Sequence, residues 1–325
     1  MHDRLAVPWA GGGWDVSRMK LAVILVNYNG KQYNEACIDS ILSGEGAWEL
    51  KIFVVDNASA DDSMQMLQKC YHGEERVQIA LLNKNYGFSR ANNEGIRLAK
   101  QWGAEAVLLL NNDTEVEPDM ISELAQCAMR HPDCVIAPKI YYSDRRDVLW
   151  SAGGEVSPIV RKVRHIGLNQ KDTGQFDKER RIGFATGCCL LLPRAVIEKS
   201  GLLDERFFLY YEDTEYCFRL RKMGIDIWYC PRARLYHKVG ASSKGADSPL
   251  CAYYIARNWL LCNRLHLRGR YPLFLFYYGI NRTICCLLWL FRGKWALVQA
   301  TWRGIRDHCK RRYGRARIAE ETANR

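Results

Sequence analysis

A run of five apolar residues, Ala106 to Leu110, ends abruptly in Asn111, Asn112 and Asp113. Such a run is typical of a strand that is buried on both faces, as in parallel sheets. Ligands of open α/β sheets bind at the carboxyl ends of the strands, so this pattern brings a carboxylate and two amides to a binding crevice. Oxygen donors of this kind suit Mg²⁺ or Mn²⁺ held together with substrate phosphates. A polar turn that caps the next helix accounts for the same stretch equally well.

A second acidic cluster follows an aromatic segment at residues 207–211. Glu212, Asp213 and Glu215 stand at the predicted start of a helix, where the helix dipole alone favours negative charge. The aromatic segment would also remove water from a neighbouring carboxylate. A carboxylate so placed can act as a general base on a sugar hydroxyl.

Two further features carry weaker signals. His237 is a lone histidine, and it gains a functional interpretation only beside a metal ion. In the segment 83–95, Gly87 gives backbone freedom and Arg90 could face a diphosphate, while Asn92 opens a helix whose N–H groups attract anions. A loop followed by an ordinary helix start is the simpler interpretation of that segment.

Strands and helices alternate through the first half of the chain, which predicts a doubly wound, mostly parallel α/β sheet. The apolar runs predict strands at Leu21–Val26, Ile52–Val55, Val77–Leu82 and Val107–Leu110, with helices near 31–42, 62–71, 90–102 and 120–130. Three of these four strands end in Asn or Asp clusters, which indicates a polar ligand site at one sheet edge. Further strands are predicted at Val135–Tyr142, Val148–Val156, Phe184–Leu192 and Ile225–Cys230, the last ended by Pro231, and a helix at Glu212–Met223.

The charge of the chain is concentrated at its C-terminal end. Residues 251–325 contain 15 Lys/Arg and 3 Asp/Glu, whereas the first 250 residues contain 32 and 33. We expect a disordered N-terminal extension at 1–18, an α/β domain at 19–247 and a basic amphipathic helical tail at 248–325. The 13 cysteines show no C-x-x-C spacing and lie mostly in apolar runs, which predicts free thiols in a reducing cytosol.

Seven segments, taken in order and spacing, resemble the family 2 glycosyltransferases over about residues 20–260. They are VNYNG at 26–30, VVDNAS at 54–59, NYGFSRANNEG at 85–95, LLLNNDT at 108–114, ATGCCLLLPRA at 185–195, GLLDERFFLYYEDTEYCFRLRKMG at 201–224 and HKVGASS at 237–243. Within the family the chain is most similar to bacterial rhamnosyltransferase-like enzymes that build cell-surface polysaccharide.

The resemblance implies the nucleotide-sugar-binding GT-A fold, a nucleotide-binding half joined to an acceptor half, and an inverting mechanism. It implies that Asp113 binds a divalent cation, Mg²⁺ or Mn²⁺, and that His237 is a further contact of the metal or the diphosphate. It also implies that Asp213, or else Glu212, is the catalytic base. It places the nucleotide sugar against Asn27, Asn29, Asp56, Asn57, Asn85, Gly87, Arg90, Asn92, Asn111 and Asn112. We expect Trp150, Gly153, Gly154 and Tyr211 to shape the acceptor site. The family's usual metal motif is Asp-x-Asp, and here Asn111 occupies its first position.

The tail suggests contact with a membrane. Residues 271–291 are long enough to span a bilayer, but Arg282 stands in the middle, and an arginine there costs ~2.5 kcal/mol or more. Tryptophans alternating with basic residues favour helices that lie in an anionic membrane interface. We therefore expect a cytoplasmic protein held peripherally on the inner face of the cell membrane. A helical homodimer interface is the alternative.

The preferred hypothesis is a metal-dependent transferase that moves sugar from dTDP-rhamnose or a UDP-sugar to a glycan or lipid-linked saccharide. A sugar-phosphate nucleotidyltransferase would share the βαβ layout, but it needs a Gly-rich basic loop after the first strand, which residues 26–30 do not provide. A dinucleotide-dependent dehydrogenase would need a G-x-G-x-x-G motif there. A non-enzymatic nucleotide-binding or nucleic-acid-binding protein using the basic tail is a further alternative, although we expect no nucleic-acid partner.

Overall fold

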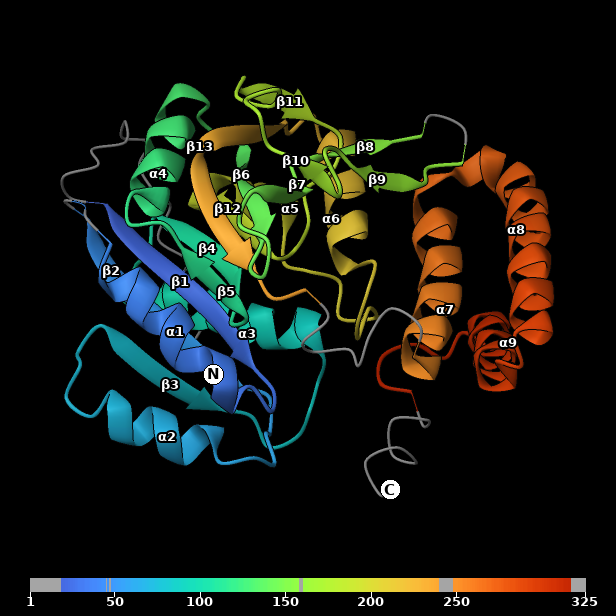
Figure 1. Cartoon of the computed structure of the whole chain (residues 1–325), viewed down its shortest axis with the longest axis horizontal. Coiled ribbons are helices and arrows are strands. Elements are labelled where there is room, and N and C mark those ends of the chain that lie inside the picture. The colour runs from blue at the N-terminus through green and yellow to red at the C-terminus, as the bar shows by residue number, and fades with distance from the viewer. Residues whose placement is uncertain (1–18, 45, 47, 158–159, 240–247, 317–325) are drawn as a thin grey trace, which may run out of the picture.

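Figure 1 shows the computed structural model of the chain, which describes residues 19–44, 46, 48–157, 160–239 and 248–316. The predicted disordered extension at 1–18 lies outside the described residues. Within them, a large mixed sheet is flanked by helices, and a layer of three helices stands at one side.

The sheet has 11 strands, with the order β10-β7-β6-β12-β4-β1-β2-β3 along its main path. These strands are β1 (Lys20–Asn27), β2 (Glu49–Asp56), β3 (Val77–Leu81), β4 (Ala106–Asn111), β6 (Val135–Tyr142), β7 (Val148–Ser151), β10 (Gln170–Lys171) and β12 (Cys189–Pro193). Off that path, β13 (Ile227–His237) pairs with β6, β11 (Arg180–Ile182) and β5 (Thr114–Val116). A separate hairpin joins β8 (Gly154–Val156) to β9 (Val163–His165). Strands β3, β2, β1 and β4 are parallel, and β12 runs antiparallel to β4.

Helices cover both faces of the sheet. Successive side chains of a strand point to opposite faces, so each face has its own hydrophobic cluster, on which helices pack. Leu21, Val23 and Leu25 of β1 face one cluster, and Ala22 and Ile24 face the other. The first cluster includes α1 (Lys31–Leu42), α2 (Ser63–Cys70) and α4 (Met120–Arg130). The second includes α3 (Phe88–Trp102), α5 (Arg194–Ser200) and α6 (Glu212–Lys222). This arrangement is the doubly wound α/β fold that the sequence predicted.

Three sequence predictions need correction at their boundaries. Strand β13 does not end at Pro231 but continues to His237 through a register shift between Cys230 and Arg234, because a bulge accommodates a residue without an N–H donor. The predicted strand 148–156 is divided into β7 and β8 around Gly153. The predicted strand 184–192 begins only at Cys189, and Phe184 forms an isolated bridge to Gly154.

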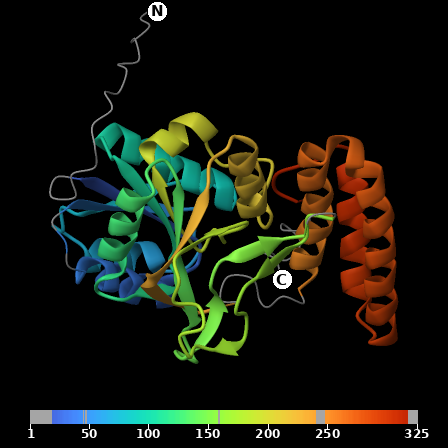
Figure 2. The same cartoon turned by 90° about the horizontal axis from the view of Figure 1, so that it is seen from above.

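Three long helices follow the sheet and stack beside it (Figure 2). Helix α7 (Pro249–His266) is buried along most of its length, whereas α8 (Tyr271–Phe291), after a short 3-10 turn at Arg268–Arg270, and α9 (Trp295–Cys309) lie outermost. His266 of α7 lies 3.2 Å from the carboxylate of Glu215 in α6, which ties the helical layer to the α/β core. The domain boundary at residues 247/248 stays a prediction.

Helix α8 is long and apolar enough to cross a membrane, and little of it is buried. Its central Arg282 does not face outward. The guanidinium lies 5.5 Å from the ring centre of Trp259 in α7 and donates to the side chain of Asn281. Arg282 therefore lies on the side of α8 that faces α7, and it does not interrupt the apolar outer face of this helix.

Candidate nucleotide-sugar site

The polar ends of three strands lie at one edge of the sheet. In the strand register, Asn27 of β1 stands opposite Asp56 of β2, and Val26 stands opposite Asn111 of β4. The parallel arrangement thus brings together three clusters that are far apart in sequence. This edge is where an open α/β sheet binds its ligand.

Asn27 is the centre of a buried hydrogen-bond network. Its Nδ2 donates to Asp56 Oδ2 at 2.9 Å and to Ser63 Oγ at 2.8 Å. Its Oδ1 accepts from Asn34 at 2.9 Å and from Asn112 at 3.3 Å. Because both ends of the Asn27 amide are engaged, its contribution to a ligand site is to position its neighbours. Asn112 likewise points inward, since its Nδ2 also donates to Asn34 Oδ1 at 2.7 Å.

Asp56 and Asn57 shape the next turn. Asp56 Oδ1 accepts from the backbone N–H of Ser59, which fixes the 56–59 turn. Asn57 spans to the loop after β3: its Nδ2 donates to Asn85 Oδ1 at 3.0 Å, and its Oδ1 accepts from the N–H of Tyr86 at 2.8 Å. The two loops are therefore a single rigid unit.

Gly87 joins that unit to the acidic segment. Its φ of 85° is in the left-handed region, and a Cβ there would lie 2.4 Å from the carbonyl oxygen of Phe208. The next residue, Phe88, donates its N–H to the same carbonyl at 2.8 Å. Glycine is required at 87 because two backbones touch there.

The remaining residues assigned to the nucleotide sugar surround this unit. Asn29 is exposed and accepts from the N–H of Ala60, and Asn111 ends β4 with its side chain half-buried. Arg90 stacks over Tyr86, 3.9 Å from the ring centre, and lies 3.9 Å from Glu205. Asn92 is buried and donates to the carbonyl of Phe88 within its own helix.

Asp113 and His237 form the cation candidate, brought together by the pairing of β5 with β13. Asp113 Oδ1 lies 3.2 Å from His237 Nε2, although the geometry is not that of a hydrogen bond. Both side chains are buried, and Asp113 Oδ1 and His237 Nδ1 have no hydrogen-bond partner. Burial lowers the pKa of His237, but the neighbouring Cys188 and Asp113 outweigh it and raise that pKa to about 10. Protonated in this way, His237 is an ion-pair partner of Asp113, and it would have to lose that proton before it could ligate a cation.

Cys188 and Gly187 connect this pair to the second acidic cluster. The carbonyl of Cys188 accepts from the N–H of Asn111 at 2.8 Å, which sets it beside the end of β4. The N–H of Gly187 donates to Asp213 Oδ2 at 3.1 Å. The two acidic clusters predicted from the sequence therefore meet at one corner, through a segment that the residue predictions did not include.

Glu212 and Asp213 differ in what stabilises their charge. Asp213 is half-buried, and its oxygens accept from the N–H groups of Gly187 and Thr214 and from the Thr214 hydroxyl. Glu212 is buried, and its Oε2 has no hydrogen-bond partner. Burial and the charge of Asp213 raise the pKa of Glu212 to about 8. Burial also raises the pKa of Asp213, but its hydrogen bonds oppose that rise. Asp213 has more hydrogen bonds that favour its ionised form, so of the two carboxylates Glu212 is the more readily protonated.

The backbone immediately before this pair is strained. Tyr210 and Tyr211 have φ of 65° and 73°, a region that such side chains rarely adopt. Asn258, buried in α7, donates to the carbonyls of Leu209 and Tyr210, each at 2.9 Å, and clamps the loop. The residue predictions did not include Asn258, although a polar residue inside the apolar run of α7 was a visible signal.

The acceptor predictions fall into two groups. Trp150 packs its ring edge to face against His237, with ring centres 4.6 Å apart, and so borders the cation candidate. It also contacts His165 at 4.9 Å, another residue that the predictions missed. Gly153 and Gly154 are buried, and a Cβ on them would lie 2.8 Å from Ile182 and 2.6 Å from Phe184. These glycines permit close packing beneath the site.

Comparison with known proteins identifies the family of this chain and its fold. The sequence model of the family described as glycosyl transferase family 2 matches residues 22–201. The chain is 30% identical over 244 residues, 75% of each protein, to the low-salt glycan biosynthesis hexosyltransferase Agl10 of Haloferax volcanii. It is 26% identical over 274 residues, 78% of this chain and 87% of the relative, to the N-acetylglucosaminyl-diphospho-decaprenol L-rhamnosyltransferase of Mycobacterium tuberculosis.

Among solved structures, the mannosyltransferase PcManGT of Pyrobaculum calidifontis in complex with GDP-Man and Mn²⁺ superposes with a TM-score of 0.55. The match covers 98% of this chain and 82% of that one at 14% identity, so it shows a common fold.

Proposed function

The chain belongs to glycosyl transferase family 2 and is a glycosyltransferase of GT-A fold, and we propose that it transfers sugar from a nucleotide-sugar donor with inversion at the anomeric carbon. The observation that carries this proposal is the corner where Gly187 and Cys188 join Asp213 to Asn111 and Asp113. Inverting transfer needs a charge-stabilising group at the leaving diphosphate and a base on the opposite side of the sugar. One corner supplies both.

The residues at this corner fit a divalent cation. Asp113 Oδ1 is buried without a hydrogen-bond partner and lies 3.2 Å from His237 Nε2, so these two donor atoms are close enough to share one cation. A carboxylate with donor phosphates is the kind of ligand set that Mg²⁺ and Mn²⁺ take. When bound, the cation would neutralise charge that develops on the departing diphosphate.

Asp213 is the base in this proposal. It is the more exposed carboxylate of the pair, and its hydrogen bonds with the start of α6 favour the ionised form. It takes the proton from the acceptor hydroxyl as that oxygen attacks the anomeric carbon. Burial and the charge of Asp213 raise the pKa of Glu212 and favour its protonated form, so Glu212 is the proton-bearing partner of this pair in the proposal. Asp56, Asn57, Asn85 and Asn111 hold the nucleotide, and Trp150 and Tyr211 border the acceptor.

The relatives suggest the substrates. The Mycobacterium tuberculosis relative is named for rhamnose transfer to a diphospho-decaprenol-linked sugar, and the Haloferax volcanii relative for hexose transfer in glycan biosynthesis. We accordingly place dTDP-rhamnose first among donors, before UDP-sugars, and a lipid-linked saccharide as acceptor. Membership of the family and these relatives weigh against a nucleotidyltransferase.

A lipid-linked acceptor requires that the enzyme reach a membrane surface. The outer side of α8 is suited to contact such a surface. Large apolar side chains at helical spacing are exposed along its outer side: Leu273, Phe276, Ile280, Ile284, Leu287 and Phe291. Trp295 and Trp302 of α9 are also exposed, and basic residues accompany them. Such a face suits an anionic bilayer, so we propose peripheral attachment to the inner face of the cell membrane.

Release of nucleoside diphosphate from a donor panel with Mn²⁺ tests the activity. We expect turnover with one donor, abolished in Asp113→Ala and in Asp213→Asn. Asp144→Asn removes an exposed surface carboxylate and is the matched control. Full turnover in both site variants would overturn the residue assignment, and a folded protein inert toward every donor would overturn the donor class.

Liposome flotation tests the membrane face. Phe276→Glu with Ile280→Glu, in the full-length chain, should abolish binding to anionic vesicles. Leu81→Glu is the control, because Leu81 is comparably exposed but lies on β3, far from α8 (Figure 1). Equal flotation of both variants, or concentration-dependent dimerisation lost only in the α8 variant, would contradict membrane binding through this face.

A further inference from the structure

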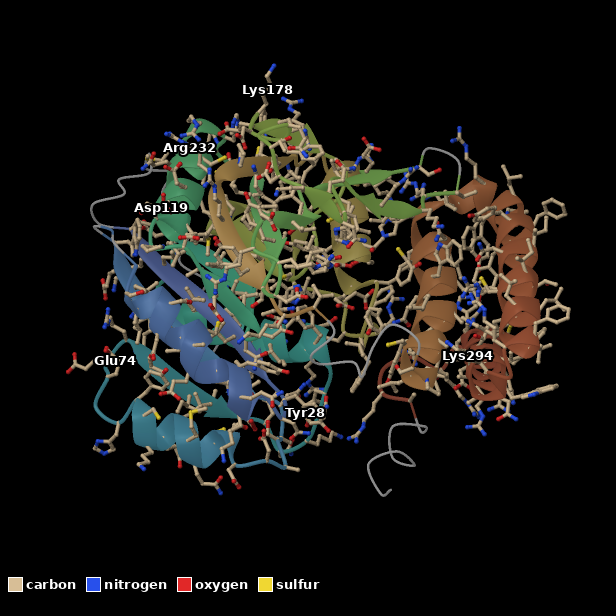
Figure 3. All side chains as sticks on the ribbon, viewed as in Figure 1. Tyr28, Glu74, Asp119, Lys178, Arg232 and Lys294 are labelled. Atoms are coloured by element: carbon tan, nitrogen blue, oxygen red, sulfur yellow. The ribbon has the colours of Figure 1, made fainter. Side chains whose placement is uncertain are left out.

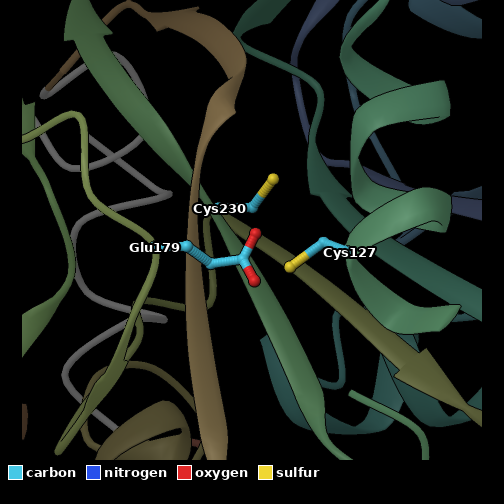
Figure 4. Close-up of side chains that lie close together, drawn as sticks. All are labelled: Cys127, Glu179 and Cys230. Atoms are coloured by element: carbon cyan, nitrogen blue, oxygen red, sulfur yellow. The ribbon is translucent and has the colours of Figure 1, made fainter. Parts of the chain in front are cut away.

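A second group of potential ligands lies between α4, β13 and the segment before β11. Cys127, Cys230 and Glu179 each offer one donor atom, and these atoms all lie within 4.8 Å of one another. Figure 4 shows the three side chains, from three separate elements, converging on one point. Both thiols are buried, and Glu179 is half-buried.

We propose that Cys127, Cys230 and Glu179 bind one zinc ion, with a water in the fourth position on the exposed side of Glu179. Two soft thiolates with one carboxylate suit Zn²⁺ and do not suit Mg²⁺ or Mn²⁺. The half-buried carboxylate provides the path by which an ion enters. This proposal does not depend on the sugar-transfer proposal.

The bulge in β13 prepares Cys230 for this role. The strand register shifts between Cys230 and Arg234, and the Cys230 sulfur lies 3.5 Å from the carbonyl oxygen of Glu123, so the thiol points toward α4.

Glu179 is held in place by two basic side chains. Arg130 Nη2 donates to Glu179 Oε2 at 2.6 Å, and His131 Nε2 lies 2.5 Å from Glu179 Oε1. The His131 ring stacks on Trp228 with ring centres 3.5 Å apart. Ligating carboxylates characteristically have such outer partners, which fix their orientation.

The charges balance when an ion is present. Two thiolates and one carboxylate would carry three negative charges, and Zn²⁺ with Arg130 would carry three positive ones. In the metal-free protein, Cys230 donates its thiol proton to the carbonyl of Glu123 at 3.5 Å. Binding of zinc would release the thiol protons of both Cys127 and Cys230 to solvent, and affinity would therefore rise with pH.

This cluster is separate from the sugar-transfer site. Arg232 and Lys178, sequence neighbours of the ligands, lie at the opposite end of the molecule from Tyr28, which follows Asn27 (Figure 3). Cys230 and His237 lie on the same strand but about 20 Å apart along it. The ion would cross-link α4, β13 and the segment before β11, and so stabilise the strand that ends at His237.

Metal content and cobalt spectroscopy test the proposal on the full-length chain, purified without a metal-chelating column. We expect about one zinc ion per chain, and a thiolate-to-cobalt charge-transfer band when Co²⁺ alone is added to the zinc-free protein. Cys127→Ser and Cys230→Ser should lose both signals. Cys70→Ser, which removes an exposed thiol of α2, and Asp113→Asn should keep both.

His131→Phe keeps the ring stack on Trp228 but removes the contact to Glu179. It should weaken zinc affinity by about 10-fold to 100-fold. This variant tests the zinc site even if the cysteine variants do not fold. Absence of zinc and of a cobalt–thiolate band in the wild-type chain would overturn the proposal, leaving two hydrogen-bonded core thiols. Formation of a Cys127–Cys230 disulfide in place of metal binding would overturn it as well.

Discussion

The strand-end asparagines and the carboxylate corner share one edge of the sheet, but they differ in how their polar atoms are satisfied. Asn27, Asp56 and Asn57 are bonded to neighbouring side chains and turns. By contrast, Asp113 Oδ1, Glu212 Oε2 and His237 Nδ1 are buried without a hydrogen-bond partner. An unsatisfied buried group costs about 1–3 kcal/mol, so the second region holds energy that a ligand can recover. The first region thus positions the loops that we propose border the nucleotide, and the second is where we propose that the chemistry takes place.

The strongest test of this difference is Asp213→Asn. The amide cannot accept the proton of the acceptor, and general-base catalysis is worth about 10²-fold to 10⁴-fold in rate. We expect kcat to fall by that amount with thermal stability nearly unchanged. Steady-state kinetics beside a melting curve measure both. A large loss of stability with kcat retained in the folded fraction would make Asp213 a structural residue.

Asn27→Leu should mainly reduce stability, because it removes the centre of the buried hydrogen-bond network at the strand ends. It leaves Asp56 Oδ2 and Asn34 Nδ2 without their shared partner, at a cost of roughly 2–4 kcal/mol in unfolding free energy. Urea denaturation compared with Gln101→Leu, on the exposed side of α3, measures this cost. An effect no larger than that of the control would show that the network contributes little.

Gly87→Ala tests the link between the two regions. The new methyl would lie 2.4 Å from the Phe208 carbonyl oxygen, and alanine is strained at a φ of 85°. We expect a loss of about 1–3 kcal/mol and a fall in kcat, because the Phe208 segment leads to Glu212. Gly73→Ala, which has a similar φ but open space around its Cβ, isolates the backbone strain from the contact. Equal effects of the two variants would refute the role of the contact.

The smallest expected effect is a change in how the stability of the folded protein depends on pH. Folded Glu212 keeps its proton to about pH 8, whereas in the unfolded chain it ionises near its ordinary pKa of about 4.3. The folded state binds more protons between these values, so stability falls as pH rises through that window. Glu212→Gln should flatten this fall in melting temperature between about pH 5 and pH 8. Glu198→Gln, at an exposed site, should not, and an unchanged slope in Glu212→Gln would contradict the raised pKa.

Much of the site could be predicted because strand ends are local signals. Apolar runs that stop at Asn27, Asp56 and Asn111 are enough to identify a polar edge, because parallel strands end together. The acidic helix start was also a local signal, whereas the pairing of Asp113 with His237 followed from the family resemblance. Their atomic states could not be predicted in this way. Which oxygens stay unpaired depends on neighbours from distant elements, such as Gly187 beside Asp213.

The sequence by itself determined the alternation of elements, the polar strand ends, the family and the concentration of basic charge at the C-terminal end. Tertiary structure decided the rest, because burial and partners are properties of three-dimensional neighbours. In the folded chain β13 continues past Pro231, and Arg282 packs on the ring of Trp259. Asn258 of α7 donates a hydrogen bond to the strained loop before Glu212. Tertiary structure also brought Cys127 and Cys230 together, although no spacing in the sequence pairs them.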